Sequence, residues 1–233
     1  MKKIVIGIFA LFLLLSFTGC DFFVTSWGSG MQRDLDSALK KESAGDLAKL
    51  AKDPQFQDPS SGVAVLNALS GKSEADIQAL SVSEQESIMD LALAVSIPTS
   101  VVTELADIAQ DPDNAEPKEL FNTILGGINS FDTTVLQTIL SDEEAQLSAS
   151  PDALAGASLA LVAQVLKREN LNFADLEGLF DGNGDIDSQK ITDQSKTDLE
   201  AVKAIYDLFD EGGKRSDENL TLFGQSLNFG GDE

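Results

Sequence analysis

The chain contains no histidine and a single cysteine among its 233 residues. Without histidine there is no imidazole to act as a general base and no histidine ligand for zinc. A single cysteine excludes an internal disulfide and a cluster of thiolates. Histidine-dependent catalytic triads and the common zinc sites are therefore ruled out before any motif is considered.

Basic residues are also scarce: 16 Lys and Arg stand against 39 Asp and Glu, a formal net charge of −23. No nucleic-acid partner is expected, because affinity for phosphates depends on Lys and Arg. The same charge repels the acidic headgroups of a lipid surface. The apolar fraction of 42% is still enough for a core, and the length is that of one domain or a closely packed pair.

The first 20 residues join a short basic region to an apolar run. Lys2 and Lys3 precede Ile4 to Phe17, which is too short to span a membrane comfortably, and two small residues then lead to Cys20. This order is typical of a secretory signal rather than of a structural helix.

The ending Ser16-Phe17-Thr18-Gly19-Cys20 resembles the lipobox of bacterial lipoproteins, although Phe17 departs from the usual aliphatic residue. The resemblance implies that residues 1–19 are a lipoprotein signal peptide and that Cys20, once it is the first residue, carries acyl chains. The mature chain has lost the two lysines of the signal, and its net charge is −25. The acyl chains must therefore hold it at the membrane, and two or three chains bind stably where one does not. Which membrane of the envelope it occupies stays open.

Residues 20–30 lack periodicity and end in Gly and Ser, which predicts a lipidated tether. Phe22, Phe23 and Trp27 could lie at the bilayer interface, where aromatic residues are favoured, or could pack on the body.

From Met31 onward, apolar residues recur at helical spacing, and prolines stand beside Asp, Ser or Glu, where they start or separate helices. Residues 31–233 are therefore expected to form an acidic all-α domain, either a helical bundle or a short helical-repeat array. Strand is expected at most in Leu220 to Phe229, which is either extended or packed back on the helices.

The chain also shows signs of an internal duplication at an offset of 58 residues. Leu47 to Pro54 matches Leu105 to Pro112 at this offset. Two multi-helix units at 47–104 and 105–160 would explain the match. Chance recurrence of Ala- and Leu-rich helices that end in Asp-Pro is the alternative.

Four further segments bear on the helices. Ser83 to Glu86 and Ser141 to Glu144, which also align at this offset, have the form of capping boxes, in which a hydroxyl caps the helix and a Glu reaches back. Ile88 to Val102 carries one charge, and Ala153 to Leu166 carries none. A helix that is apolar all round is normally central in a core. We expect core helices there, with the walls of an apolar cavity or a membrane-inserting segment as alternatives.

Motifs for catalysis are weak, and the chain is predicted not to be an enzyme. Ser37-Ala38-Leu39-Lys40 fits the Ser-x-x-Lys pattern of penicillin-recognising enzymes, but Lys196-Thr197-Asp198 lacks the required Gly and precedes Ser226-Leu227-Asn228. Paired carboxylates, as in glycoside hydrolysis, occur throughout so acidic a chain and indicate no particular site.

One loop places oxygen-bearing side chains at alternate positions, within a C-terminal helix-loop-helix predicted at 170–233. Its members are Asp181, Asn183, Asp185 and Asp187. Calcium takes six to eight oxygen ligands, and this spacing resembles the first five positions of an EF-hand loop. Ile186 then replaces the turn Gly and Thr192 the bidentate Glu, so the prediction is a weak calcium site or a plain helix-to-helix turn.

These observations favour a bacterial lipoprotein, anchored through its acyl chains and facing the periplasm or the cell exterior. We expect it to act as a non-catalytic helical interaction or scaffold module for an envelope protein partner. The alternative is a binding protein for an apolar small molecule or lipid, with the apolar helices as its walls. No cofactor is expected apart from the candidate calcium ion.

Overall fold

The computed structural model describes residues 35–96, 127–171, 179, 186–187, 189–210, 212–218, 220–222 and 225–226. Over these residues the protein is all-α, as predicted from the sequence. Its elements are α3 (Ala44–Ala51), the 3-10 turn η1 (Pro54–Phe56), α4 (Pro59–Ser70), α5 (Glu74–Gln78), α6 (Val82–Ser96), α9 (Thr134–Ser141), α10 (Glu143–Ser148), α11 (Pro151–Glu169), α12 (Asp193–Phe209) and the strands β1 (Thr221–Leu222) and β2 (Gln225–Ser226).

The helices begin where the sequence supplies a capping oxygen. Asp58 accepts hydrogen bonds from the first backbone N–H groups of α4, and Ser150 and Thr192 do the same for α11 and α12. Pro59 and Pro151 follow as first helical residues, where the N–H that proline lacks is not needed. Prolines in the described residues therefore start helices, as expected.

The two predicted capping boxes are used differently from the prediction. The box of α6 starts two residues early, at Ser81, whose N–H and hydroxyl both donate to Glu84, at 2.9 and 2.7 Å. The same Ser-x-x-Glu spacing occurs there, and it leaves Ser83 inside the helix. At α10 the cap is the carboxylate of Asp142, while the hydroxyl of Ser141 donates back to a carbonyl of α9.

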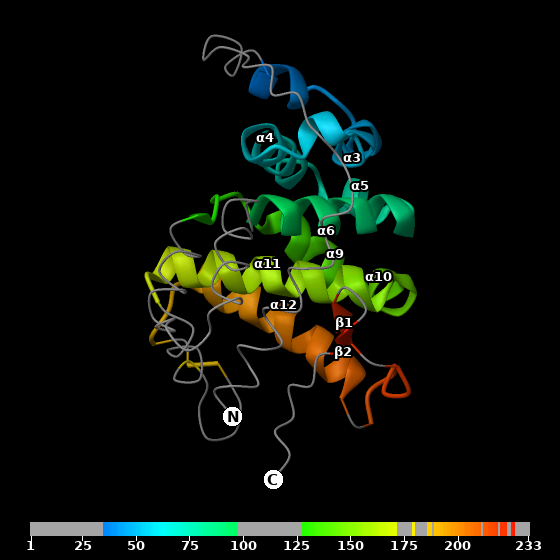
Figure 1. Cartoon of the computed structure of the whole chain (residues 1–233), viewed down its shortest axis with the longest axis vertical. Coiled ribbons are helices and arrows are strands. Elements are labelled where there is room, and N and C mark those ends of the chain that lie inside the picture. Colours follow the sequence, from blue (N-terminus) through cyan, green and yellow to red (C-terminus); the bar gives the residue numbers. More distant parts are fainter. Residues whose placement is uncertain are drawn as a thin grey trace, which may run out of the picture.

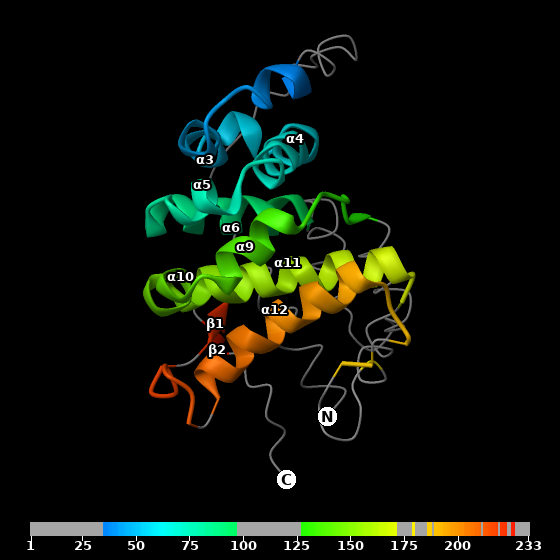
Figure 2. The ribbon, with the colours of Figure 1, turned by 180° about the vertical axis from the view of Figure 1, so that it is seen from behind.

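The helices follow one another along the longest axis of the molecule (Figures 1 and 2). Helices α3 and α4 lie at one end, α6 comes next, and α11 and α12 lie beyond it. Helix α6 packs against α3, α4 and α11, and α11 packs against α12. The two longest apolar helices, α6 and α11, thus lie in the interior of this stack, where each has neighbours on both sides.

Helix α11 confirms the core prediction. Every residue from Ala153 to Leu166 is buried except Leu159 and Val162, which are half-buried. The part of Ile88 to Val102 that the structure describes lies in α6, and most of its apolar side chains are buried as well. In the part of the chain that the structure describes, no helix is both long and apolar enough to cross a membrane.

Helices α4 and α6 approach closely at Gly62. A Cβ on this residue would lie 2.5 Å from Cγ2 of Val95 and 3.1 Å from Cδ1 of Leu91, which is closer than side chains tolerate. The absence of a side chain at Gly62 therefore sets the separation of these helices.

Two successive groups of helices share one order: α4, α5 and α6, then α9, α10 and α11. The caps correspond, because Ser73 and Asp142 start the short helices and Ser81 and Ser150 precede the long ones. Both pairs are 69 residues apart. The described helices therefore repeat a helix, short helix, long helix order at that offset.

The offset of 58 residues pairs segments that hold different places in the structure. Ser83 to Glu86 lie in the first turn of α6, whereas Ser141 to Glu144 span the junction of α9 and α10. The other paired segments fall within 97–126, outside the described residues, so the predicted units 47–104 and 105–160 remain a prediction.

The C-terminal part adds one long helix and a small hairpin to the stack. Thr192 caps α12, which ends at Phe209. Strands β1 and β2 pair antiparallel, and β1 lies against α11. The segment from Leu220 is thus both extended and packed back on the helices, the two possibilities that the sequence left open.

Candidate functional site

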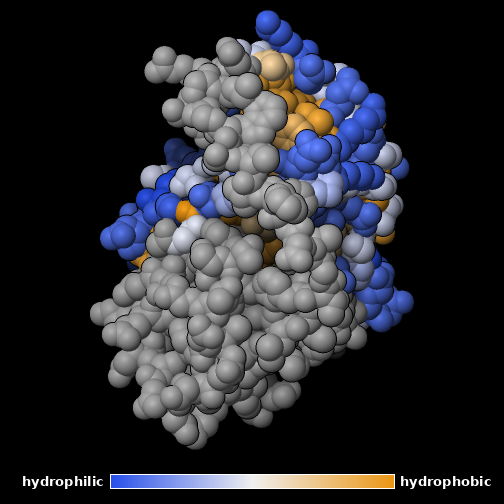
Figure 3. All heavy atoms as spheres, turned by 45° about the horizontal axis from the view of Figure 1, so that its top comes forward, coloured by the Kyte–Doolittle hydropathy of each residue, from blue (hydrophilic) through white to orange (hydrophobic). Residues whose placement is uncertain are grey.

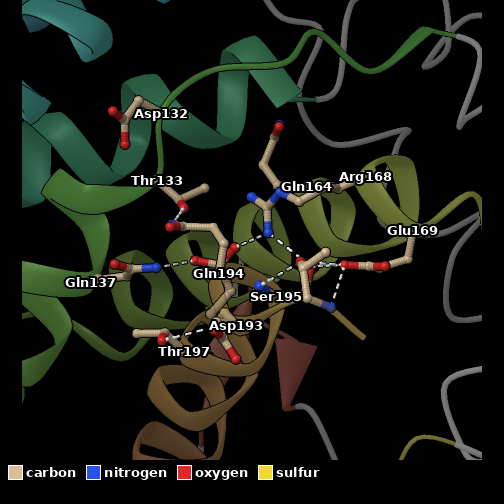
Figure 4. Close-up of polar contacts among 12 residues, drawn as sticks. Asp132, Thr133, Gln137, Gln164, Arg168, Glu169, Asp193, Gln194, Ser195 and Thr197 are labelled. Atoms are coloured by element: carbon tan, nitrogen blue, oxygen red, sulfur yellow. Dashed lines mark hydrogen bonds and ion pairs between the residues drawn. The ribbon is translucent and has the colours of Figure 1, made fainter. Parts of the chain in front are cut away.

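Helices α9, α11 and α12 bring polar side chains together at their junction (Figure 4). We call this group the polar cluster. Its central members are Gln137 from α9, Arg168 and Glu169 from α11, and Thr192, Ser195 and Asp198 from α12 and its cap.

An ion pair lies at the centre of the polar cluster. Nη1 of Arg168 is 2.8 Å from Oδ2 of Asp198, and Nε2 of Gln137 donates to the other carboxylate oxygen at 2.6 Å. The side chain of Asp198 is 0% exposed and that of Arg168 is 28% exposed. A buried carboxylate is tolerated only when it is paired and hydrogen-bonded, and both oxygens of Asp198 have donors.

A second carboxylate holds the start of α12. Oε1 of Glu169 accepts hydrogen bonds from the N–H of Thr192 at 3.0 Å and from the hydroxyls of Thr192 and Ser195 at 2.5 Å each. Burial alone would raise the pKa of Glu169, but the bonds from Ser195 and Thr192 outweigh burial and hold this pKa below its ordinary range. The charged form therefore persists at the N-terminus of α12, where the helix dipole favours a negative charge.

These groups engage one another rather than an open site. The hydroxyl of Ser195 donates to Glu169 and accepts from Nη1 of Arg168 at 2.9 Å, and Ser195 is fully buried. A serine nucleophile must be reachable and must face a base with a pKa suited to taking its proton. Ser195 is not reachable, and the lowered pKa makes Glu169 a poor base. The polar cluster is built to join helices.

Further hydrogen bonds extend the junction along α11. Gln164 donates to the carbonyl of Asn129 at 2.8 Å and accepts from the N–H of Phe131 at 3.4 Å, and Lys167 donates to the carbonyl of Ile128. Helix α11 thereby satisfies the backbone of the irregular segment before α9, which would otherwise be buried without partners.

The described residues include little of the predicted calcium loop. Asp181, Asn183 and Asp185 lie outside them, as does the predicted lipidation site Cys20. The carboxylate of Asp187 is engaged locally, because Oδ1 accepts from the N–H of Gln189 at 3.1 Å and Oδ2 pairs with Lys190 at 3.0 Å. The hydrogen bond from Lys190 lowers the pKa of Asp187. Within the described ranges, no three acidic or cysteine side chains are grouped so that they could hold a metal ion.

The ends of the loop are nevertheless well placed. The N–H of Asp187 donates to the carbonyl of Leu179 at 2.8 Å, which brings these two residues together. Leu179 is buried with Val165 of α11 and Leu199 of α12. Glu169 and Thr192 join the chain further out, so both of its crossings between α11 and α12 are held by specific contacts.

Sequence reasoning did not identify the polar cluster. A signal was present, because Ser195 and Asp198 occupy the inward face of α12 beside Leu199, and an inward acidic residue needs a partner. The partner could not be found from the sequence, because Arg168 lies 30 residues away on another helix. No protein-family model, curated protein or solved structure matches this chain, so its function is argued from its own residues.

Proposed function

We propose that this chain is a membrane-anchored lipoprotein of a bacterial cell envelope and that its all-α body is a non-catalytic interaction or scaffold module. The anchor is supported by the lipobox-like ending at Cys20, which is the single cysteine of the chain. With a mature net charge of −25, the body needs acyl chains to stay at an acidic membrane surface.

The observation that carries the role of the body is the internal engagement of the polar cluster. Arg168, Asp198, Glu169 and Ser195 form the most buried set of polar groups joining these helices, and their bonds run to one another. Such a junction stabilises a particular arrangement of helices instead of binding a substrate. What the body then offers to other molecules is its helical surface, as in repeat arrays that present extended binding faces.

The anchor is tested by expressing the full chain and Cys20→Ala in a bacterium that is fed labelled palmitate. The unchanged chain should carry the label and sediment with membranes, whereas Cys20→Ala should lose the label and either stay uncleaved or be released. Gly19→Ala is the matched control, because it keeps a small residue before the cut and should be processed. A Cys20→Ala chain that is cleaved and remains membrane-bound would contradict the proposal.

The role of the body is tested by photo-crosslinking from exposed positions on several helices of the anchored chain. An interaction module should give adducts with a protein at neighbouring positions and none elsewhere. If no position gives an adduct, and organic solvent extracts an apolar compound from the purified chain in a constant ratio, the body is instead a binding protein for that compound.

A further inference from the structure

Helix α10 presents an apolar side chain to solvent between acidic ones. Among the described residues, Leu147 is the large apolar side chain that stands exposed, at 43%. Glu143 and Glu144 lie three and four residues before it, on the same side of the helix, and both are exposed, while Ala145 faces the core. We call Glu143, Glu144 and Leu147, with the acidic residues described next, the α10 face.

Carboxylates of two neighbouring helices border α10. Glu86 of α6 accepts a hydrogen bond from the N–H of Ser150, at the junction of α10 and α11, at 2.7 Å. Asp90, one turn further along α6, is close enough to Glu86 and to Asp152 of α11 for their charges to raise its pKa, in addition to the effect of burial. Figures 1 and 2 both show α10 on the same side of the molecule as the beginning of α6.

This side of the molecule lacks basic residues of its own. Residues 73–96 and 127–166 contain ten Asp and Glu but no Lys or Arg. Elsewhere the two signs are mixed, as at the paired Lys203 and Asp207 of α12. In Figure 3, blue hydrophilic residues predominate in the described part of the face shown, and orange hydrophobic residues appear in smaller areas.

The chain itself shows what kind of segment binds beside α10. Lys214, from the segment that follows α12, pairs with Glu143. Nη1 of the neighbouring Arg215 donates to the carbonyls of Gln146 and Ala149, at 3.0 and 2.8 Å, at the end of α10. The guanidinium of Arg215 also stacks 4.7 Å from the ring centroid of Phe209. A segment that combines basic and apolar side chains therefore already packs along one side of this helix.

We propose that the α10 face is a docking site for a basic amphipathic segment of a partner protein. The proposal rests on the proposed function, since it names the surface and the partner chemistry of the interaction module. Leu147 would contact an apolar residue of the partner, and Glu144, Glu86 and Asp90 would face its Lys and Arg side chains. Charge complementarity of this kind speeds association and selects the partner, while the apolar contact slows dissociation.

The test uses the purified full-length chain in an uncharged detergent and a helical peptide with one face of leucines and one of lysines. A peptide with glutamates in place of the lysines should not bind. Leu147→Ser should weaken binding about fivefold, because docking covers a leucine that is already more than half buried. Glu144→Lys should weaken it about tenfold, and added salt should remove most of this difference.

The matched control is Glu42→Lys, which makes the same charge change near α3, at the opposite end of the stack from α10 (Figure 1). It should weaken binding less than twofold. Equal losses in Glu144→Lys and Glu42→Lys, or an unchanged affinity in Leu147→Ser, would overturn the docking site by showing attraction to the net charge alone. Photo-crosslinks from other faces would then still support the interaction module, so the two proposals fail separately.

Discussion

Replacing Arg168 with methionine would leave the carboxylate of Asp198 buried without its cation. Asp198 is 0% exposed and would keep only the hydrogen bond from Gln137. Removing one partner of a buried ion pair costs about 3–5 kcal/mol, because an uncompensated charge remains in a medium of low polarity. Arg168→Met is therefore expected to be among the more destabilising single changes in this chain.

The reverse change should cost less. In Asp198→Ala the guanidinium of Arg168, which is 28% exposed, can turn to water and keeps its bond to Ser195. Its expected cost is about 1–3 kcal/mol, that of lost hydrogen bonds. The double change Arg168→Met with Asp198→Leu should be more stable than Arg168→Met alone, because it removes the orphaned charge and restores apolar packing.

Thermal melts followed by circular dichroism would measure these differences. For a chain of this size, 1 kcal/mol shifts Tm by about 2–4 °C, so Arg168→Met should lower Tm by roughly 10 °C. Lys203→Met is the control, because it breaks an exposed pair with Asp207 on α12 and should cost no more than about 0.5 kcal/mol. If Arg168→Met costs no more than Lys203→Met, or if the double change is the least stable, the assigned role of the polar cluster is wrong.

Three further predictions concern other parts of the chain. Gly62→Ala should destabilise by about 1–3 kcal/mol because its Cβ would enter the α4–α6 contact, whereas Gly45→Ala, in open space on α3, should stabilise by about 0.5–1 kcal/mol; chemical denaturation of both variants decides this. Asp90→Asn should raise Tm at neutral pH, because partial burial and two neighbouring carboxylates raise the pKa of Asp90. A raised pKa means stability that is present at low pH and lost as pH rises, so the gain should vanish on acidification, and a gain independent of pH would contradict it. Calcium should raise Tm more than magnesium, with a Kd of about 10⁻⁴–10⁻³ M, and Asp181→Ala with Asp185→Ala should abolish the difference; equal shifts for both ions would reduce the loop to a plain turn.

Much of the secondary structure could be predicted from local patterns. The uncharged run from Ala153 to Leu166 indicated a core helix, and Pro59 and Pro151 indicated helix starts, as observed. These signals work because an apolar surface must be buried and because a proline is tolerated only in the first turn. The choice between Ser81 and Ser83 as the cap of α6 was less certain, because both precede a Glu by three residues.

The candidate site was much less predictable. Gln137, Arg168 and Asp198 come from three helices and are far apart in the chain, and nothing local in the sequence pairs them. The calcium loop and the lipobox, by contrast, were visible because each is a short contiguous motif. Short motifs are read from spacing, whereas a junction depends on which helices pack together.

The sequence by itself determined that this protein is helical, acidic and without histidine chemistry, because composition and periodicity act residue by residue. It also contained the lipobox-like ending at Cys20, which no packing is needed to recognise. Only the tertiary structure decided that α6 and α11 pack together, that Gly62 sets the approach of α4, and that Arg168 meets Asp198. Such contacts depend on the shape of both surfaces and on the burial of charge, which exist only once the chain has folded.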